Sequence, residues 1–201
     1  MFPPEFSSDL RERARVQIRA RMRALRAAYP KAALSERSAA IVERIAALPA
    51  YRDARSVALF WPMPHEVDLR ALDALCRSSE KSVFYPVMDP IPSGVRTGFA
   101  LGEGTASLAP RSERFFEPPP EAPRAQRGDI ELIVVPALAV GANGHRLGYG
   151  RGFYDVTLPD FRPPAKSVVV AYEFQLLSEL PELDHDVASD YVVTDSRTLE
   201  V

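Results

Sequence analysis

The stretch that decides the fold is residues 130–155, which reads IELIVVPALAVGANGHRLGYGRGFYD. It begins with an apolar run, centred on residues 132–135, that is typical of a buried β-strand. Three glycines, Gly148, Gly150 and Gly152, follow at alternate positions. In open α/β sheets, ligands bind beyond the carboxyl ends of the strands. The stretch therefore predicts a strand followed by a ligand-binding loop.

The loop has the composition of a phosphate site. Glycines leave backbone N–H groups open to a phosphate, and Arg146 and Arg151 can each make two parallel hydrogen bonds to phosphate oxygens. Asp155 closes the loop with a carboxylate. A Mg²⁺ ion bound to a nucleotide usually takes one or two protein carboxylates. The composition indicates a nucleoside triphosphate with its metal ion.

The standard phosphate-loop signatures do not match this loop. A P-loop requires a Gly-Lys-Ser/Thr sequence, and the loop contains no lysine. The dinucleotide fingerprint requires two residues between its second and third glycines, where Arg151 stands alone. A flexible turn is therefore the alternative to a phosphate cradle. The two arginines and Asp155 are the features that favour the cradle.

The composition of the whole chain is that of an ordinary globular protein. Its 201 residues suit a single domain, and its hydrophobic content of 46% supports a substantial core. The formal net charge of -2 argues against a general polyanion binder. One cysteine, Cys76, excludes an internal disulfide and fits a reducing compartment. Because residues 1–10 lack the signal-peptide pattern and no apolar run reaches membrane-spanning length, we expect a cytoplasmic protein.

Predicted helices and strands alternate along the chain. Apolar residues at three- and four-residue spacing predict a helix over residues 10–28, and Ser35 is a candidate cap for a second helix that ends at Pro49. Strands are predicted at residues 56–60, 81–87, 98–101, 132–135, 167–171 and 191–194, and short helices at 69–76, from 152 to the prolines at 159, 163 and 164, and at 175–180. A turn is predicted at 89–94 and an irregular, proline-rich connection at 102–128. The alternation predicts an α/β fold: a three-layer sandwich with a mostly parallel sheet covered by helices on both faces, preceded by an Arg-rich N-terminal helix.

The helix predicted over residues 10–28 has a basic polar side. Arg15 and Arg19 lie one turn apart beside its apolar stripe, so they can point into a cleft. A solvated face is the alternative for most of its arginines. Nucleic-acid binding is a third interpretation, which lacks the aromatic residues that usually interleave the basic ones.

Two further segments carry candidate site residues. Trp61 can stack on a flat heterocycle, and Glu66 can accept two hydrogen bonds from an amidine-like edge such as that of a pterin. The alternative places Trp61 in the core and Glu66 at a helix N-terminus. Residues 184–190 contain three aspartates, which indicate either a metal or arginine nearby or a loop of solvated charges. The histidines and Cys76 lack zinc-site spacing.

These motifs together resemble the 5-formyltetrahydrofolate cyclo-ligase family, also called 5,10-methenyltetrahydrofolate synthetase. Residues 146–155, Arg-Leu-Gly-Tyr-Gly-Arg-Gly-Phe-Tyr-Asp, are similar to the family signature Arg-Leu-Gly-x-Gly-x-Gly-Tyr-Tyr-Asp. Weaker matches follow the same order along the chain: Glu66-Val67-Asp68, residues 171–175 before Leu180-Pro181, and His185-Asp186 with Asp190. The resemblance covers nearly the whole chain and implies one domain of this family over residues 1–201.

The resemblance implies ATP- and Mg²⁺-dependent cyclisation of 5-formyltetrahydrofolate to 5,10-methenyltetrahydrofolate, with release of ADP and phosphate. It assigns catalysis to Arg146 and Arg151 and metal binding to Asp155 and Asp186. The residues that it assigns to ATP are Arg15, Val16, Gln17, Ile18, Arg19, Arg146, Leu147, Gly148, Tyr149, Gly150, Arg151, Gly152, Phe153 and Tyr154. Those assigned to the folate are Arg19, Trp61, Glu66, Tyr149, Gly150, Arg151, Gly152 and Phe153. We expect a monomer that acts on this small molecule, with no nucleic-acid or membrane partner.

Six positions depart from the family pattern. They are Phe153 in place of the first tyrosine of Tyr-Tyr-Asp, Val156 where arginine is common, Val140-Gly141 in place of Phe-Asp, Trp61 where a smaller or phenolic side chain is typical, and Arg15 where lysine is frequent. None of them removes a charge that the reaction needs. Two alternatives follow: a non-catalytic folate- or nucleotide-binding module, and a paralogue that acts on a related compound.

Overall fold

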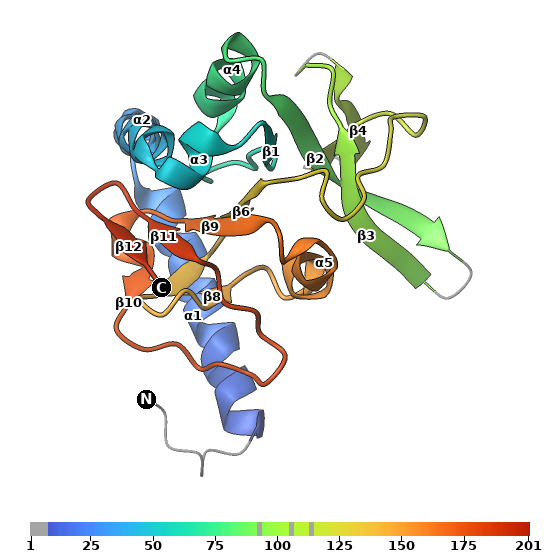
Figure 1. Ribbon diagram of the computed structural model, residues 1–201. Coiled ribbons are helices and arrows are strands. Elements are labelled where there is room, and N and C mark those ends of the chain that lie inside the picture. Colours follow the sequence, from blue (N-terminus) through green and yellow to red (C-terminus); the bar gives the residue numbers. More distant parts are fainter. Residues whose placement is uncertain (1–7, 92–93, 105–106, 113–114) are drawn as a thin grey trace.

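The structure is a computed structural model that describes residues 8–91, 94–104, 107–112 and 115–201 (Figure 1). Its helices are α1 (Ser8–Ala28), α2 (Lys31–Ala47), α3 (Pro49–Asp53), α4 (Arg70–Ser78), α5 (Phe153–Phe161) and the 3₁₀ turn η2 (Glu173–Gln175). Its strands are β1 (Ser56–Ala58), β2 (Ser82–Ile91), β3 (Gly94–Leu101), β4 (Ala109–Ser112), β5 (Phe115–Glu117), β6 (Leu132–Pro136), β7 (Ala139–Gly141), β8 (Arg146–Leu147), β9 (Lys166–Val170), β10 (Leu176–Leu177), β11 (Tyr191–Val193) and β12 (Thr198–Glu200).

The central sheet has seven strands in the order β12-β11-β9-β6-β1-β2-β3. Its five inner strands, from β11 to β2, are parallel, and β12 and β3 are antiparallel edge strands. In the middle of the sheet Val57 of β1 lies opposite Leu132 of β6 and Val83 of β2. The prediction of a mostly parallel sheet is confirmed.

Alternate residues of one strand show why the sheet is covered on both faces. Leu132 and Val134 of β6 pack into a core cluster with side chains of α2, α3 and α4. Ile133 and Val135, between and beyond them, pack into a second cluster with Leu158 and Phe161 of α5. Because a strand that is buried on both faces needs a helix layer on each, the chain forms three layers, with α2, α3 and α4 on one side and α5 on the other (Figure 1).

A second sheet lies against α1. Its three strands follow the order β10-β7-β8, and Met22 of α1 packs with Leu138, Leu147 and Leu180. The apolar run at residues 130–140 thus forms two strands in two sheets, β6 and β7, and the Gly-rich loop follows the second sheet rather than the first. The prediction that the loop directly follows the buried strand β6 is therefore wrong, because β7 lies between them. Residues 138 and 139 pack against Met22 of α1, a contact between distant segments that the local sequence does not reveal.

Three predicted helix boundaries are wrong. Helix α2 begins at Lys31 directly after its N-cap Pro30, so Ser35 lies inside it rather than capping it. Pro159 lies within α5, which continues to Phe161. The helix predicted at residues 175–180 is the turn η2 followed by β10, because Leu176 pairs with Val140 of β7.

The proline-rich connection at residues 102–128 is less irregular than predicted, since it contains the antiparallel pair β4 and β5. The turn predicted at residues 89–94 is too long, because 89–91 belong to β2 and 94 belongs to β3, and these strands pair there; residues 92–93 lie outside the described residues. The absence of a signal peptide at residues 1–10 also falls largely outside them, because 1–7 are not described. Among the described helices, none has both the length and the apolar character needed to cross a membrane.

Candidate active site

The Gly-rich loop, residues 143–155, runs from the end of β7 through β8 to the first turn of α5. Gly152 is the N-cap of α5 with a φ of 63°, and Gly150 has a φ of 93°, both in the left-handed region that favours glycine. A Cβ on Gly150 would lie 3.4 Å from Cζ of Arg19. Arg19 Nε donates a hydrogen bond of 3.1 Å to the Gly148 carbonyl. The structure therefore brings α1 and the loop into direct contact, as two of the sequence-predicted segments require.

Arg146 is a buried cation at the base of the loop. Its Nη2 donates to Asp155 Oδ1 over 2.8 Å, and its Nη1 donates to the Val187 carbonyl over 2.5 Å. Its guanidinium also lies 5.8 Å from the Tyr154 ring centroid. Burial lowers the pKa of Arg146, while the charge of Asp155 opposes that effect. Arginine is not deprotonated in proteins near neutral pH, so the side chain remains a cation.

Arg15 and Asp186 form a second buried ion pair, between α1 and the loop before β11. Their side chains are 8% and 3% exposed. Both guanidinium Nη atoms donate to the carboxylate, and the Arg15 Nη2 to Asp186 Oδ1 distance is 3.1 Å. Burial raises the pKa of Asp186, but the hydrogen bonds from Arg15 and from the Leu183 N–H outweigh it and hold the pKa below its usual value.

The two candidate metal carboxylates, Asp155 and Asp186, both lie near the backbone of Val187. The Val187 N–H donates to Asp155 Oδ1 over 3.3 Å, and Asp186 is its chain neighbour. Two carboxylates fit a Mg²⁺ ion that completes its shell with phosphate and water. Within the described parts of the chain, no three histidine, cysteine or carboxylate side chains converge.

The three aspartates of residues 184–190 do not act as one cluster. Asp184 is exposed, Asp186 is held by Arg15, and Asp190 forms ion pairs with Arg162 and Lys166. Two of the carboxylates thus have arginine partners, as mutual repulsion requires.

Glu66 is buried beside the Gly-rich loop. It is 6% exposed, its Oε2 accepts the Met63 N–H over 2.9 Å, and its backbone carbonyl accepts the Tyr172 hydroxyl over 2.9 Å. Burial raises the pKa of Glu66, and the Met63 N–H, Arg26 and Tyr149 act in the opposite direction. Helix α4 begins at Arg70 with Leu69 as its N-cap. Glu66 therefore lies outside the first turn of α4, and the helix-terminus alternative is wrong.

Trp61, on the same loop after β1, packs against the core cluster that α2, α3 and α4 form with the sheet. Its ring centroid lies 5.8 Å from that of Phe116 in β5, at an interplanar angle of 49°. The core alternative for Trp61 is therefore borne out. The side chain is half-buried, and stacking of its ring on a heterocycle stays a prediction.

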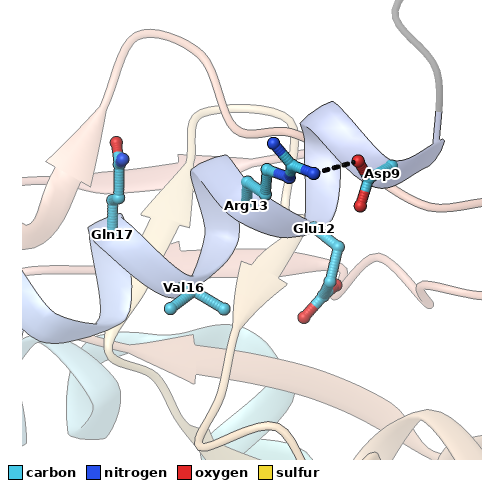
Figure 2. A pocket seen from close by; sticks show the side chains of 5 residues that line it. All are labelled: Asp9, Glu12, Arg13, Val16 and Gln17. Carbon is cyan, nitrogen blue, oxygen red and sulfur yellow. Dashed lines mark ion pairs between the residues drawn. The ribbon is translucent and has the colours of Figure 1, made fainter.

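Not every predicted ATP residue faces the loop. Val16 and Gln17 are exposed on α1, where they line a shallow hollow of about 310 Å³ with Asp9, Glu12 and Arg13. Figure 2 shows these five side chains and the ion pair between Arg13 and Asp9. All five residues belong to one helix. Ile18 and Leu147 pack in the core against Met22, and Phe153 makes an edge contact with Phe99. Arg151 is exposed and has no ion pair among the described residues.

One buried arginine was missed from the sequence. Arg26 is 4% exposed, and its Nη2 donates to the Tyr149 hydroxyl. It follows Arg15 by three helical turns, since eleven residues at about 3.6 per turn return to the same face of α1. The spacing of Arg15 and Arg26 is the sequence signal that could have placed Arg26 on the same face of the helix as Arg15. Arg15, Arg19 and Arg26 line the inner face, whereas Arg13, Arg21 and Arg23 are exposed.

The fold and the site together define a class: an α/β sandwich in which a Gly- and Arg-rich loop meets an arginine-bearing helix and buried carboxylates. A family model described as "5-formyltetrahydrofolate cyclo-ligase family" matches residues 11–195. The chain belongs to the 5-formyltetrahydrofolate cyclo-ligase family.

Known proteins support this membership over different lengths. A 5-formyltetrahydrofolate cyclo-ligase of Mycolicibacterium smegmatis is 45% identical over 80 residues, which are 40% of this chain and 41% of the relative. One of Escherichia coli is 28% identical over 73% of this chain and 81% of the relative. The solved structure of Aquifex aeolicus 5,10-methenyltetrahydrofolate synthetase is 27% identical, with a TM-score of 0.79 over 92% of each chain. The resemblance inferred from residues 146–155 is confirmed.

Proposed function

We propose that this protein catalyses the ATP- and Mg²⁺-dependent cyclisation of 5-formyltetrahydrofolate to 5,10-methenyltetrahydrofolate, releasing ADP and phosphate. One observation carries the proposal: the Gly-rich loop is in direct contact with Arg19 of α1 and lies beside the buried Glu66. An anion site and a carboxylate that can hold a pterin thus adjoin, as the reaction between a nucleotide and a folate requires. Membership of the cyclo-ligase family supports the same reaction.

The arginines and glycines are assigned to the nucleotide phosphates. Phosphoryl transfer depends mainly on positioning and on neutralising charge. Arg151 is exposed on the loop, and Arg19 holds the loop through the Gly148 carbonyl. Arg146 is fixed between Asp155 and Val187, so its charge is oriented before any ligand binds. Arg15 becomes available to a phosphate if Asp186 turns to a cation.

Asp155 and Asp186 are assigned to Mg²⁺. When bound, this ion neutralises charge on the phosphates. Both carboxylates lie near the backbone of Val187, and each is paired with an arginine. Arrival of a phosphate and a cation would let the arginines and the carboxylates exchange partners without leaving any charge buried and unpaired.

Glu66 is assigned to the pterin. Its Oε1 is buried without a hydrogen-bond partner among the described residues, and a pterin offers a ring N–H and an amine to such an acceptor. Folate held in this way would have to present its formyl group to the loop for the reaction to occur. The γ-phosphoryl group of ATP would be transferred to the formyl oxygen, N10 would attack the formyl carbon and lose its proton to solvent, and phosphate would leave with that oxygen. We also infer a monomeric cytoplasmic enzyme without a nucleic-acid or membrane partner, in keeping with the near-neutral charge and the single cysteine.

The experiment is near-ultraviolet absorbance of the purified protein mixed with 5-formyltetrahydrofolate, ATP and Mg²⁺. The methenyl product is conjugated and the substrate is not, so a growing product band reports the reaction. We expect the band only when all three are present. If folate binds and no band grows, the protein is a binding module or acts on a related compound.

A further inference from the structure

Arg26 and Glu66 are two buried charges on either side of the Tyr149 hydroxyl. Arg26, near the end of α1, is 4% exposed, and Glu66, after β1, is 6% exposed. Arg26 Nη2 donates a hydrogen bond to the Tyr149 hydroxyl. The same hydroxyl acts electrostatically on the Glu66 carboxylate. Three segments that are distant in sequence therefore meet at one oxygen atom.

Each of the two charged side chains has one buried polar atom that makes no hydrogen bond within the described residues. Arg26 Nε and Glu66 Oε1 are buried, and neither has a hydrogen-bond partner among the described residues. Leaving a buried donor or a buried acceptor unpaired is unfavourable, and more so when the group is charged. Such atoms in a native fold call for an explanation. A ligand that supplies one acceptor and one donor at adjacent positions would satisfy both.

Tyr149 is positioned so that its ring can leave the site. Its side chain is on the surface side of the site, 40% exposed, although its hydroxyl reaches the two buried charges. It stands between Gly148 and Gly150, and Gly150 has a φ of 93°. Tyr149 belongs to none of the hydrophobic core clusters among the described residues. Movement of its ring out of the site would therefore leave the packed core intact.

We propose that Arg26 and Glu66 form one recognition element for the oxo, N–H and amine edge of the substrate's pterin ring, and that the Tyr149 hydroxyl occupies it until the substrate displaces it. The proposal rests on the folate-dependent function proposed above. Arg26 would donate to the pterin oxo group, and Glu66 would accept from the adjacent ring N–H and the exocyclic amine. The phenol imitates this pattern with one oxygen, which accepts from Arg26 and faces Glu66.

The protonation of Tyr149 agrees with this role. Burial, with the neighbouring Glu66 charge, raises the pKa of Tyr149 to about 12. The hydroxyl therefore keeps its proton near neutral pH and can serve as a donor toward the carboxylate. A pterin ring N–H also keeps its proton near neutral pH, so it can replace the hydroxyl as the donor to the Glu66 carboxylate.

The test compares three variants by equilibrium dialysis without ATP, against 5-formyltetrahydrofolate and against its analogue with a 4-amino group in place of the 4-oxo group. Arg26→Leu should weaken binding of the oxo compound roughly ten- to hundredfold, as expected for loss of a hydrogen bond from a charged donor. It should weaken binding of the amino analogue much less, because that group cannot accept from Arg26. Tyr149→Phe should tighten binding of the oxo compound, since the competing hydroxyl is gone. Arg23→Leu, exposed on the same helix, is the matched control and should change neither affinity.

Equal losses for both compounds in Arg26→Leu, or weaker oxo binding in Tyr149→Phe, would overturn the proposal. If Arg26→Leu does not fold, the opposite shift expected of Tyr149→Phe still decides the matter. Wild-type protein that forms the methenyl product while Arg26→Leu binds folate normally refutes this inference alone. Wild-type protein that forms no product refutes the proposed function instead.

Discussion

Replacing Arg15 by leucine should destabilise the protein more than its helical position suggests. Arg15 and Asp186 are 8% and 3% exposed, so the substitution leaves a carboxylate buried without its cation. It also removes a hydrogen bond of 3.0 Å to the Pro181 carbonyl. Breaking one side of a buried ion pair costs about 3–5 kcal/mol, a large part of the total stability of about 5–15 kcal/mol that domains of this kind have.

The double variant Arg15→Leu/Asp186→Leu should recover most of this loss. Desolvation offsets much of the attraction in a buried pair, so replacing both partners by apolar groups is often nearly neutral. Simple addition of the two single losses would predict about 6–10 kcal/mol, and the shortfall is the coupling energy of the pair. The Arg13–Asp9 pair is the matched control, since its 2.8 Å contact lies on the same helix with side chains 71% and 67% exposed. Asp9→Asn should cost less than about 1 kcal/mol.

The assay is urea unfolding followed by far-ultraviolet circular dichroism at neutral pH, with a chelator present so that no bound cation contributes. The four proteins of the cycle and the Asp9→Asn control are compared at equal concentration. A loss below about 1 kcal/mol for Arg15→Leu would show that the pair is not buried as described. A double variant less stable than either single one would refute the assumption that desolvation offsets the attraction.

Three further predictions concern the loop and the folate side. Asp155→Asn should lower turnover by about a hundredfold or more with an unchanged dichroism spectrum, and full activity at limiting Mg²⁺ would exclude Asp155 as a metal ligand. Glu66→Gln should raise the dissociation constant for 5-formyltetrahydrofolate about tenfold while nucleotide binding, measured by calorimetry, stays the same; an unchanged folate affinity would leave Glu66 a structural role only. Gly144→Ala should destabilise the protein by more than about 1 kcal/mol, because its Cβ would lie 2.4 Å from the Ser189 carbonyl at a φ of 80°; Gly148→Ala, with nothing within 4 Å, is the control, and equal melting temperatures would contradict the close approach.

The sheet was predictable because its inner strands are buried on both faces. Runs such as residues 132–135 and 168–171 are then continuously apolar, and they indicate strands without any tertiary information. The Gly-rich loop was predictable because its residue types are unusual and closely spaced. Arg146 and Asp155, both within it, pair in the structure.

The elements that were missed depend on contacts between distant segments. Strand β10 exists because Leu176 pairs with Val140, and the local sequence also suits a helical turn. Ser35 is a good helix cap by residue type, but Pro30 starts the helix earlier because proline is well suited to the beginning of a helix.

The candidate site residues could be singled out from the sequence, whereas their pairings could not, and their roles stay a prediction. Arg15, Arg19 and Glu66 follow from motif order and helix spacing, whereas the pairing of Arg15 with Asp186 requires the loop before β11 to lie against α1. Arg26 has the same residue type as its solvated neighbours, Arg23 among them. Only the angular position of Arg26 on α1, three turns from Arg15, separates it from them.

The stoichiometry of the reaction tests the proposed ATP-dependent cyclisation most directly. Methenyl product is followed by absorbance and inorganic phosphate by a coupled assay in the same reaction mixture of protein, 5-formyltetrahydrofolate, ATP and Mg²⁺. We expect phosphate and methenyl product to appear together in equal amounts, and the formation of both to stop when Mg²⁺ is chelated. Formation of product without phosphate, or phosphate release that does not depend on the folate, would contradict the proposed reaction.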